Sequence, residues 1–135
     1  MSGLQKAQGK LVSFDINIPS FMDEFKNMKD LPCSWEFRQR STIDEDLNIN
    51  ETDLLFVDSL HTYEQVRDEL RLHATRVSKF IVFHDAYSHG EFSRDIRGQE
   101  GILRAINEFV GSSSEWEQVY KVDFNHGLIV LEKTA

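Results

Sequence analysis

Short apolar runs alternate along the chain with stretches of helical period. The runs 54–57 and 80–83 are bounded by polar residues and have the length of one buried strand each. After the first run, apolar residues recur from Val66 at the spacing of one helix face. Thr62 stands at the cap position of that helix and Gln65 follows three residues later, a pattern typical of a capping box. The stretch therefore predicts a buried strand followed by an amphipathic helix, as in a βαβ unit.

The other segments follow the same alternation. Strands are predicted at 11–16, 34–38, 116–124 and 128–131, with a tight turn at 125–127 between the last two. The end of a helix or a short lead-in is predicted at 1–10, and helices are predicted at 20–28 and 102–110, with Gly111 ending the last. A turn of helix and a loop are predicted at 41–50, and a mobile loop at 86–98. Continuous apolar runs are typical of parallel strands buried on both faces. The pattern predicts a single α/β domain over 1–135, with a mostly parallel sheet in a three-layer Rossmann-like arrangement and a C-terminal antiparallel hairpin.

Composition narrows the classes of partner. The 135 residues are 40% hydrophobic and 28% charged, typical of a globular protein, and a net charge of −8 argues against nucleic-acid binding. The single cysteine, Cys33, excludes an internal disulfide and fits a cytoplasmic location, with a structural thiol favoured over a nucleophile. No apolar stretch reaches membrane-spanning length, so no membrane partner is expected.

Acids and histidines follow the predicted strands. Asp58 ends the first run, and His84 and Asp85 end the second. In open α/β sheets ligands bind outside the carboxyl ends of the strands, and neighbouring strands bring those ends together. Two carboxylates and one imidazole suit a divalent metal such as Mg²⁺, Mn²⁺ or Fe²⁺. The alternative is that both acids cap helices and the histidine packs.

Two further histidines, His61 and His89, lie near the same rim. Either is a candidate general base, because imidazole titrates near neutral pH. For His61 a structural role, fixing the loop before its helix, is favoured over that of a base. Asp95, in the predicted loop, is expected to lie outside the set formed by Asp58, His84 and Asp85. Tyr63 and Tyr87 are candidates for an acceptor pocket or for packing, and His73 and His126 are expected on a helix face and in a turn.

Three stretches carry a resemblance to a known family: FVDSLHTYE at 56–64, IVFHD at 81–85, and 101–109 in the following helix. The order of elements resembles the class I S-adenosylmethionine-dependent methyltransferases. The motifs are similar to methyltransferase family 24, which includes cephalosporin-hydroxylase-like and catechol-type O-methyltransferases. The resemblance implies methylation of a small-molecule hydroxyl, with Asp58, His61 and His84 catalytic and a metal on Asp58, His84 and Asp85.

The resemblance also implies a cofactor site and a departure from the family. Asp15 would accept hydrogen bonds from the cofactor ribose, Ser41 would meet its adenine, and Asp58 would also contribute. Arg40 stands where relatives carry an acid, and Ala86 where catechol-type members carry an amide. The family's first strand and glycine-rich turn would precede residue 1, so the alignment implies an N-terminally truncated domain. Exposed strand edges would then favour a homo-oligomer.

Three functions therefore remain open. The first is an S-adenosylmethionine-dependent O-methyltransferase, assisted by a divalent metal. The second is a non-catalytic remnant or assembly module that kept the fold but lost cofactor binding, as Arg40 and the absent glycine turn suggest. The third is a hydroxylase-like protein that modifies sugars or antibiotics. The sequence does not identify the acceptor.

Overall fold

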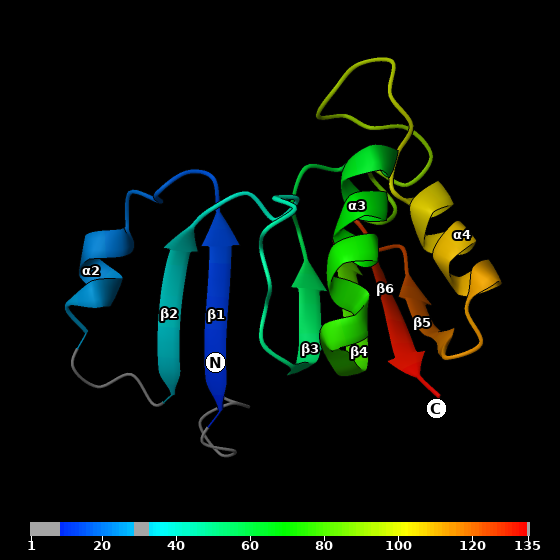
Figure 1. Ribbon diagram of the computed structural model, residues 1–135. Coiled ribbons are helices and arrows are strands. Elements are labelled where there is room, and N and C mark those ends of the chain that lie inside the picture. Colours follow the sequence, from blue (N-terminus) through cyan, green and yellow to red (C-terminus); the bar gives the residue numbers. More distant parts are fainter. Residues whose placement is uncertain (1–8, 29–32, 135) are drawn as a thin grey trace. The chain divides into compact units, whose positions relative to one another are not determined.

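The computed structural model describes residues 9–28 and 33–134 (Figure 1). The chain divides into two compact units, one within 1–44 and one within 45–135. Most of the helix predicted at 1–10 lies outside the described residues. The single domain proposed for 1–135 stays a prediction.

The first unit is built on a pair of parallel strands. Strand β1 (Lys10–Asp15) pairs with β2 (Ser34–Gln39), so that Lys10 lies opposite Ser34 and Asp15 opposite Gln39. Helix α2 (Met22–Lys26) lies between them in sequence and is shorter than predicted. The segment 41–50 forms turns without the predicted turn of helix. The two predicted strands are confirmed to within one residue at each end.

The second unit is a four-stranded mixed sheet with two helices. Its strands lie in the order β3-β4-β6-β5, in which β3 and β4 are parallel and β6 is antiparallel to both neighbours. The elements are β3 (Thr52–Val57), α3 (Tyr63–His73), the short helix η1 (Ala74–Arg76), β4 (Val77–His84), α4 (Leu103–Ser112), β5 (Trp116–Val122) and β6 (Leu128–Lys133). This arrangement confirms the α/β class and the terminal hairpin. No described helix combines the length and apolar character that crossing a membrane requires.

Both helices begin close to their predicted positions. The Thr62 hydroxyl accepts a hydrogen bond from the Gln65 backbone N–H at 3.3 Å, which confirms Thr62 as the cap of α3. Helix α4 continues through Gly111 to Ser112, so the prediction that Gly111 ends it is wrong. A glycine within a helix costs roughly 1 kcal/mol relative to alanine, too little to stop a helix that is anchored by its packing.

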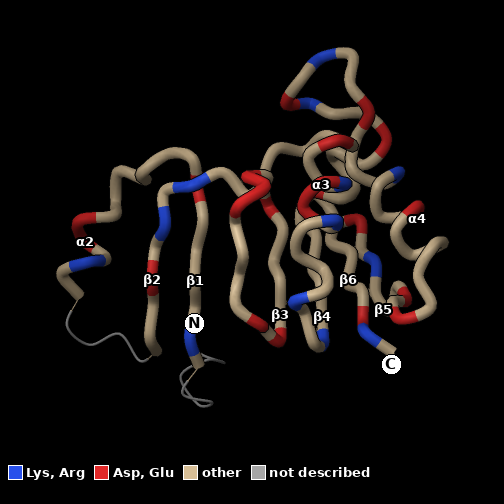
Figure 2. Tube along the Cα trace, viewed as in Figure 1, with Lys and Arg blue, Asp and Glu red and all other residues tan. Residues whose placement is uncertain are grey.

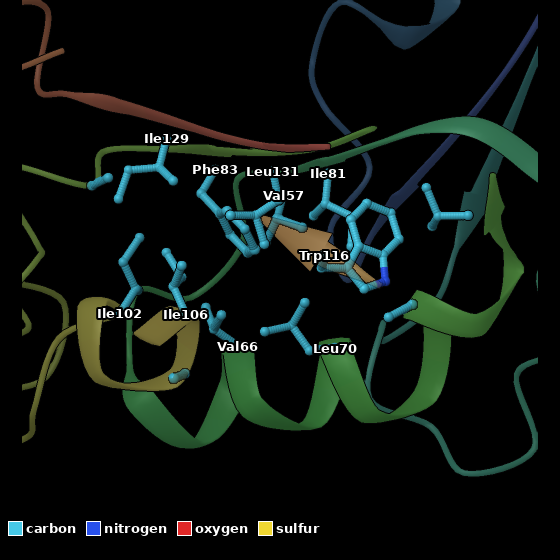
Figure 3. Packing of buried hydrophobic residues seen from close by; sticks show 14 residues of the cluster. Val57, Val66, Leu70, Ile81, Phe83, Ile102, Ile106, Trp116, Ile129 and Leu131 are labelled. Carbon is cyan, nitrogen blue, oxygen red and sulfur yellow. The ribbon is translucent and has the colours of Figure 1, made fainter. Parts of the chain in front are cut away.

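The core lies between one face of the four-stranded sheet and the two helices (Figure 3). Ile81 and Phe83 of β4 are fully buried and face Val66 of α3 and Ile106 of α4. Strand geometry sends alternate side chains to the other face, where Phe56 of β3 is 54% exposed. The prediction that the run 54–57 is buried on both faces is therefore wrong. An apolar run indicates a strand but does not reveal whether both faces are covered.

Candidate functional site

Strands β3 and β4 end side by side and deliver the candidate residues. Val57 is opposite Phe83 at the end of their parallel register, so Asp58 and His84 come next at the same edge. Asp85 follows with φ of 58°, a left-handed conformation that aspartate and asparagine tolerate better than most residues. This turn directs the Asp85 carboxylate back toward the strand ends.

Six side chains form what we call the histidine–aspartate cluster. The members all belong to the second unit and come from the ends of β3 and β4, from the segment between β3 and α3, and from the loop between β4 and α4: Asp58, His61, His84, Asp85, His89 and Asp95. One donor atom each of Asp58, His84 and Asp85 lies within 4.8 Å of the others. The structure therefore brings together the three residues that the sequence nominated for a metal.

His61 lies at the centre of this cluster. Its Nε2 is 3.2 Å from Asp58 Oδ1 and 3.2 Å from Asp85 Oδ2. Its Nδ1 and its backbone N–H both lie 2.8 Å from Asp95 Oδ2. Because a carboxylate only accepts hydrogen bonds, we assign the Nδ1 hydrogen as donated to Asp95. Nε2 then faces two carboxylates, and only a proton or a cation at that point makes both contacts attractive.

Asp95 joins the cluster through His61 and His89, and it is not among the three residues Asp58, His84 and Asp85 that it was predicted to lie outside. Burial is the largest influence on its pKa and raises it, but the His61 backbone N–H and the His61 ring together lower the pKa of Asp95 below its ordinary value. The contact joins residues 34 apart in sequence. It therefore ties the loop to the start of α3, which is the structural role considered for His61.

His89 extends the cluster from the loop. Its ring centroid is 4.3 Å from that of His61, and its Nε2 is 3.3 Å from Asp95 Oδ1. Ser88 Oγ lies 2.9 Å from His89 Nδ1. The sequence placed His89 on the same rim, and the structure confirms that position. Its chemical role stays a prediction.

Two glycines allow the loop to pack closely. A Cβ on Gly101 would lie 2.1 Å from the His89 carbonyl oxygen, and one on Gly127 would lie 2.3 Å from the Tyr87 backbone nitrogen. Gly101 N–H also donates to the Glu91 carbonyl at 2.9 Å. Figure 2 shows both acidic and basic positions along this loop. The backbone contacts hold both ends of the loop, and its predicted mobility stays a prediction.

The residues nominated for the cofactor in the first unit also follow strands. Asp15 ends β1 and accepts a hydrogen bond from the Asn17 backbone N–H at 2.8 Å. Ser41 follows β2, and its hydroxyl accepts from the Ile43 N–H at 3.4 Å. Arg40 Nε is 3.2 Å from Asp44 Oδ2. These contacts suit ordinary turns, and the roles in ribose and adenine binding stay predictions.

Several remaining candidates have structural roles. Tyr63 donates to Glu108 Oε2 at 2.6 Å, and this bond raises the pKa of the tyrosine and lowers that of the glutamate. The interaction fastens α3 to α4 away from the cluster.

A surface hollow of about 420 Å³ beside α4 is lined by residues such as Leu103 and Arg104, and by no member of the cluster. His126 lies in the hairpin turn with φ of 67°, as expected of a turn residue.

We expect Asp95→Asn to loosen the loop in a pH-dependent way. A hydrogen bond to a charged group contributes about 1–2 kcal/mol at a partly exposed site. We therefore expect the unfolding free energy of the variant at pH 7, measured with a chelator present to exclude metal, to be lower by that amount. Because the Asp95 pKa is lowered on folding, the contribution is present above about pH 4 and is lost as the pH falls through the lowered value. Urea unfolding of both proteins at several pH values measures this. A difference that stays constant down to pH 3 would contradict it.

The sequence and the fold were compared with known proteins. No family model matches the sequence, and no curated protein matches it. A Corynebacterium glutamicum protein solved by a structural genomics consortium superposes with a TM-score of 0.64 and 16% identity over 94% of this chain. The MycE methyltransferase from the mycinamycin biosynthetic pathway, in complex with Mg, SAH and mycinamycin VI, superposes with a TM-score of 0.59 and 16% identity over 93%.

These likenesses establish the fold. The chain spans 62% of the length of the Corynebacterium protein and 36% of that of MycE. At this level of identity, similarity extends to the arrangement of strands and helices and does not transfer an activity. The chain therefore shares its α/β fold with these two structures, and MycE, one of them, is a methyltransferase.

Proposed function

We propose that the chain carries the site of an S-adenosylmethionine-dependent methyltransferase that methylates a hydroxyl group of a small molecule with the help of a divalent metal. The observation that supports this most is the convergence of Asp58, His84 and Asp85 at the carboxyl ends of neighbouring parallel strands. The methyltransferase fold is consistent with this location, because ligands of open α/β sheets bind at that edge.

The residues present fit a divalent cation. Asp85 Oδ1 lies 3.1 Å from His84 Nδ1, and Asp58 Oδ1 lies 3.8 Å from the same nitrogen. That nitrogen is buried and makes no hydrogen bond of acceptable geometry. The ion-pair partners of Asp58, Asp85 and Asp95 within the described residues are all imidazoles, so no fixed positive side chain offsets the acids. A divalent metal here would supply Lewis acidity that lowers the pKa of an acceptor hydroxyl.

The protein's own groups would then position the acceptor and take its proton. We assign proton acceptance to His61, because its Nε2 points at the two carboxylates where the acceptor oxygen would be held. Asp95 fixes the ring through Nδ1, which leaves Nε2 as the nitrogen that exchanges a proton. The Asp58 carboxylate, which is half exposed, is open to both the cofactor and the acceptor.

The cofactor supplies the methyl group in this proposal. The neighbour MycE was solved with Mg and SAH, which supports the pairing of a metal with this type of cofactor on this fold. Asp15 for the ribose, Ser41 for the adenine and Asp58 are the proposed cofactor contacts, each on the strength of the family resemblance. The acceptor class, a hydroxylated small molecule, rests on the same resemblance.

A second function is favoured by one observation. Arg40, which replaces the family's acid after β2, forms an ion pair with Asp44. A guanidinium there does not provide the acceptor that an adenine amino group or ribose hydroxyl requires. A non-catalytic module that kept the fold but lost cofactor binding would show this change. Calorimetric titration with S-adenosylmethionine separates the two functions, since only the enzyme requires saturable binding.

We also propose that copies of the chain associate. Strand β3 is at one end of the strand order of its sheet, and its Leu54 and Phe56 side chains are 49% and 54% exposed. An edge strand with exposed apolar side chains favours pairing with another chain. A cytoplasmic location, and the absence of nucleic-acid and membrane partners, stay predictions of the sequence.

We expect Leu54→Lys to reduce that association. A lysine on an edge strand opposes strand-to-strand pairing by charge and by the cost of burying it. Sedimentation velocity over a hundredfold range of concentration should show wild type shifting toward a dimer and the variant remaining monomeric. Phe124→Lys, a change of an exposed apolar side chain that lies between β5 and β6 and not on an edge strand, is the control. A concentration-independent monomer for wild type would contradict the proposal.

A further inference from the structure

The two oxygens of the Asp85 carboxylate face different histidines. Oδ1 is 3.1 Å from His84 Nδ1, on the side of the proposed metal. Oδ2 is 3.2 Å from His61 Nε2, on the other side. A carboxylate in this setting can bind one cation with each oxygen. A second cation on the Oδ2 side would therefore require further donor atoms on that side.

The Oδ2 side of Asp85 has a donor set made of two imidazoles and one carboxylate. Donor atoms of His61, Asp85 and His89 lie within 4.8 Å of one another. Ligands about 2.0–2.2 Å from a tetrahedral zinc are separated by roughly 3.5 Å, so only small side-chain shifts are needed to close the set. All three side chains are partly covered rather than fully exposed. None of the three ligands is a long, flexible side chain.

Asp95 supplies the second shell of this set. Its Oδ2 lies 2.8 Å from His61 Nδ1, and its Oδ1 lies 3.3 Å from His89 Nε2. Metal-binding histidines usually use one ring nitrogen for the metal and the other for a carboxylate or carbonyl, which fixes the ring. One carboxylate that contacts both rings would hold them in a common orientation, and His89 would then bind the metal through Nδ1 in place of its contact with Ser88 Oγ.

The charge of the cluster is compatible with a second cation. Asp58, Asp85 and Asp95 contribute a formal charge of −3 when the three histidines are neutral, and one divalent ion would leave −1. A second divalent ion would leave +1, the same magnitude of imbalance that one ion leaves, so net charge does not oppose it. Like-charged carboxylates at this spacing are costly without such compensation.

We propose that His61, Asp85 and His89 form a second divalent-metal position, next to the one on Asp58 and His84 and sharing Asp85 with it. Two imidazoles make this position better suited to Zn²⁺ or Co²⁺ than to Mg²⁺. Occupancy of the position engages His61 Nε2, the nitrogen proposed above to accept a proton. The inference requires only metal binding and stands whether or not the chain transfers methyl groups.

Equilibrium dialysis with Co²⁺, read by metal analysis and visible absorption, tests this inference. We expect wild type to bind two Co²⁺ per chain, and His89→Gln and Asp58→Asn to bind one each. Of these two variants, Asp58→Asn should keep the absorption of the imidazole-rich position and His89→Gln should lose it. The control His126→Asn, in the hairpin turn, should keep two. Asp95→Asn retains every donor, and we expect it to weaken binding at this position by about 10–100-fold.

The folded state of each variant is verified by thermal melting in chelator before dialysis. One Co²⁺ per wild-type chain, or two per folded His89→Gln chain, would overturn the inference. Unchanged affinity in Asp95→Asn would overturn the second-shell role and with it the shared orientation of the two rings. None of these results depends on S-adenosylmethionine, so the inference and the proposed methyl transfer can fail separately.

Discussion

Asp85→Asn should abolish the stabilisation that Mg²⁺ or Mn²⁺ confers on the folded chain. Asp85 contributes one oxygen toward His84 and the other toward His61, so its replacement removes charge from both sides of the cluster. A ligand that binds only the folded state at 100 times its dissociation constant stabilises that state by about 2.7 kcal/mol. We expect a shift of several degrees in Tm for wild type and none for the variant, measured by thermal melting with and without metal.

The Asp85→Asn substitution removes the carboxylate charge with little change to the backbone. Asparagine tolerates the left-handed backbone that Asp85 adopts, so the variant keeps the turn and loses only the charge and the better ligand. The control is Asp123→Asn, an exposed acid outside the cluster, which should keep the wild-type shift. Equal metal-dependent shifts in wild type and Asp85→Asn would mean that the acids are simple caps of their turns.

Phe83→Ala should cost the most stability of any single change considered. Phe83 is fully buried and immediately precedes His84, so it anchors the end of β4 that delivers the cluster. Truncation of a buried phenylalanine typically costs about 3–5 kcal/mol, a large share of the roughly 5–15 kcal/mol that stabilises a domain. We expect urea unfolding to show that loss, with weakened metal binding because the strand end loses its support.

Phe124→Ala is the matched control, because Phe124 is 67% exposed before the hairpin turn. Its truncation should change the unfolding free energy by no more than about 0.5 kcal/mol. Similar losses in the two variants would show that the buried face of β4 does not dominate the stability of this unit. The comparison therefore tests the described core separately from any function.

The convergence of Asp58, His84 and Asp85 could be predicted because it follows from local pattern. Each apolar run predicts one strand, and parallel neighbours bring their carboxyl ends to one edge. The cap at Thr62 was equally local and equally predictable. Both features are determined by a few adjacent residues and by one rule of strand order.

Asp95 could not be found in this way. It contacts His61 across 34 residues, from a loop without periodicity, and no spacing in the sequence signals that contact. The half-exposed Phe56 illustrates a second reason. Whether the second face of a strand is covered depends on other elements of the fold. The same apolar strand sequence can occur with one face covered or with both.

Calorimetric titration with S-adenosylmethionine tests the central proposal most directly. We expect saturable binding at one site per chain in the presence of Mg²⁺, with micromolar affinity. Asp15→Asn should weaken it about tenfold or more, because a hydrogen bond from a ribose hydroxyl to a carboxylate is worth about 1.5–3 kcal/mol. Asp123→Asn should leave it unchanged. No binding at millimolar S-adenosylmethionine by the folded, metal-loaded chain would contradict the enzyme proposal and favour the non-catalytic module.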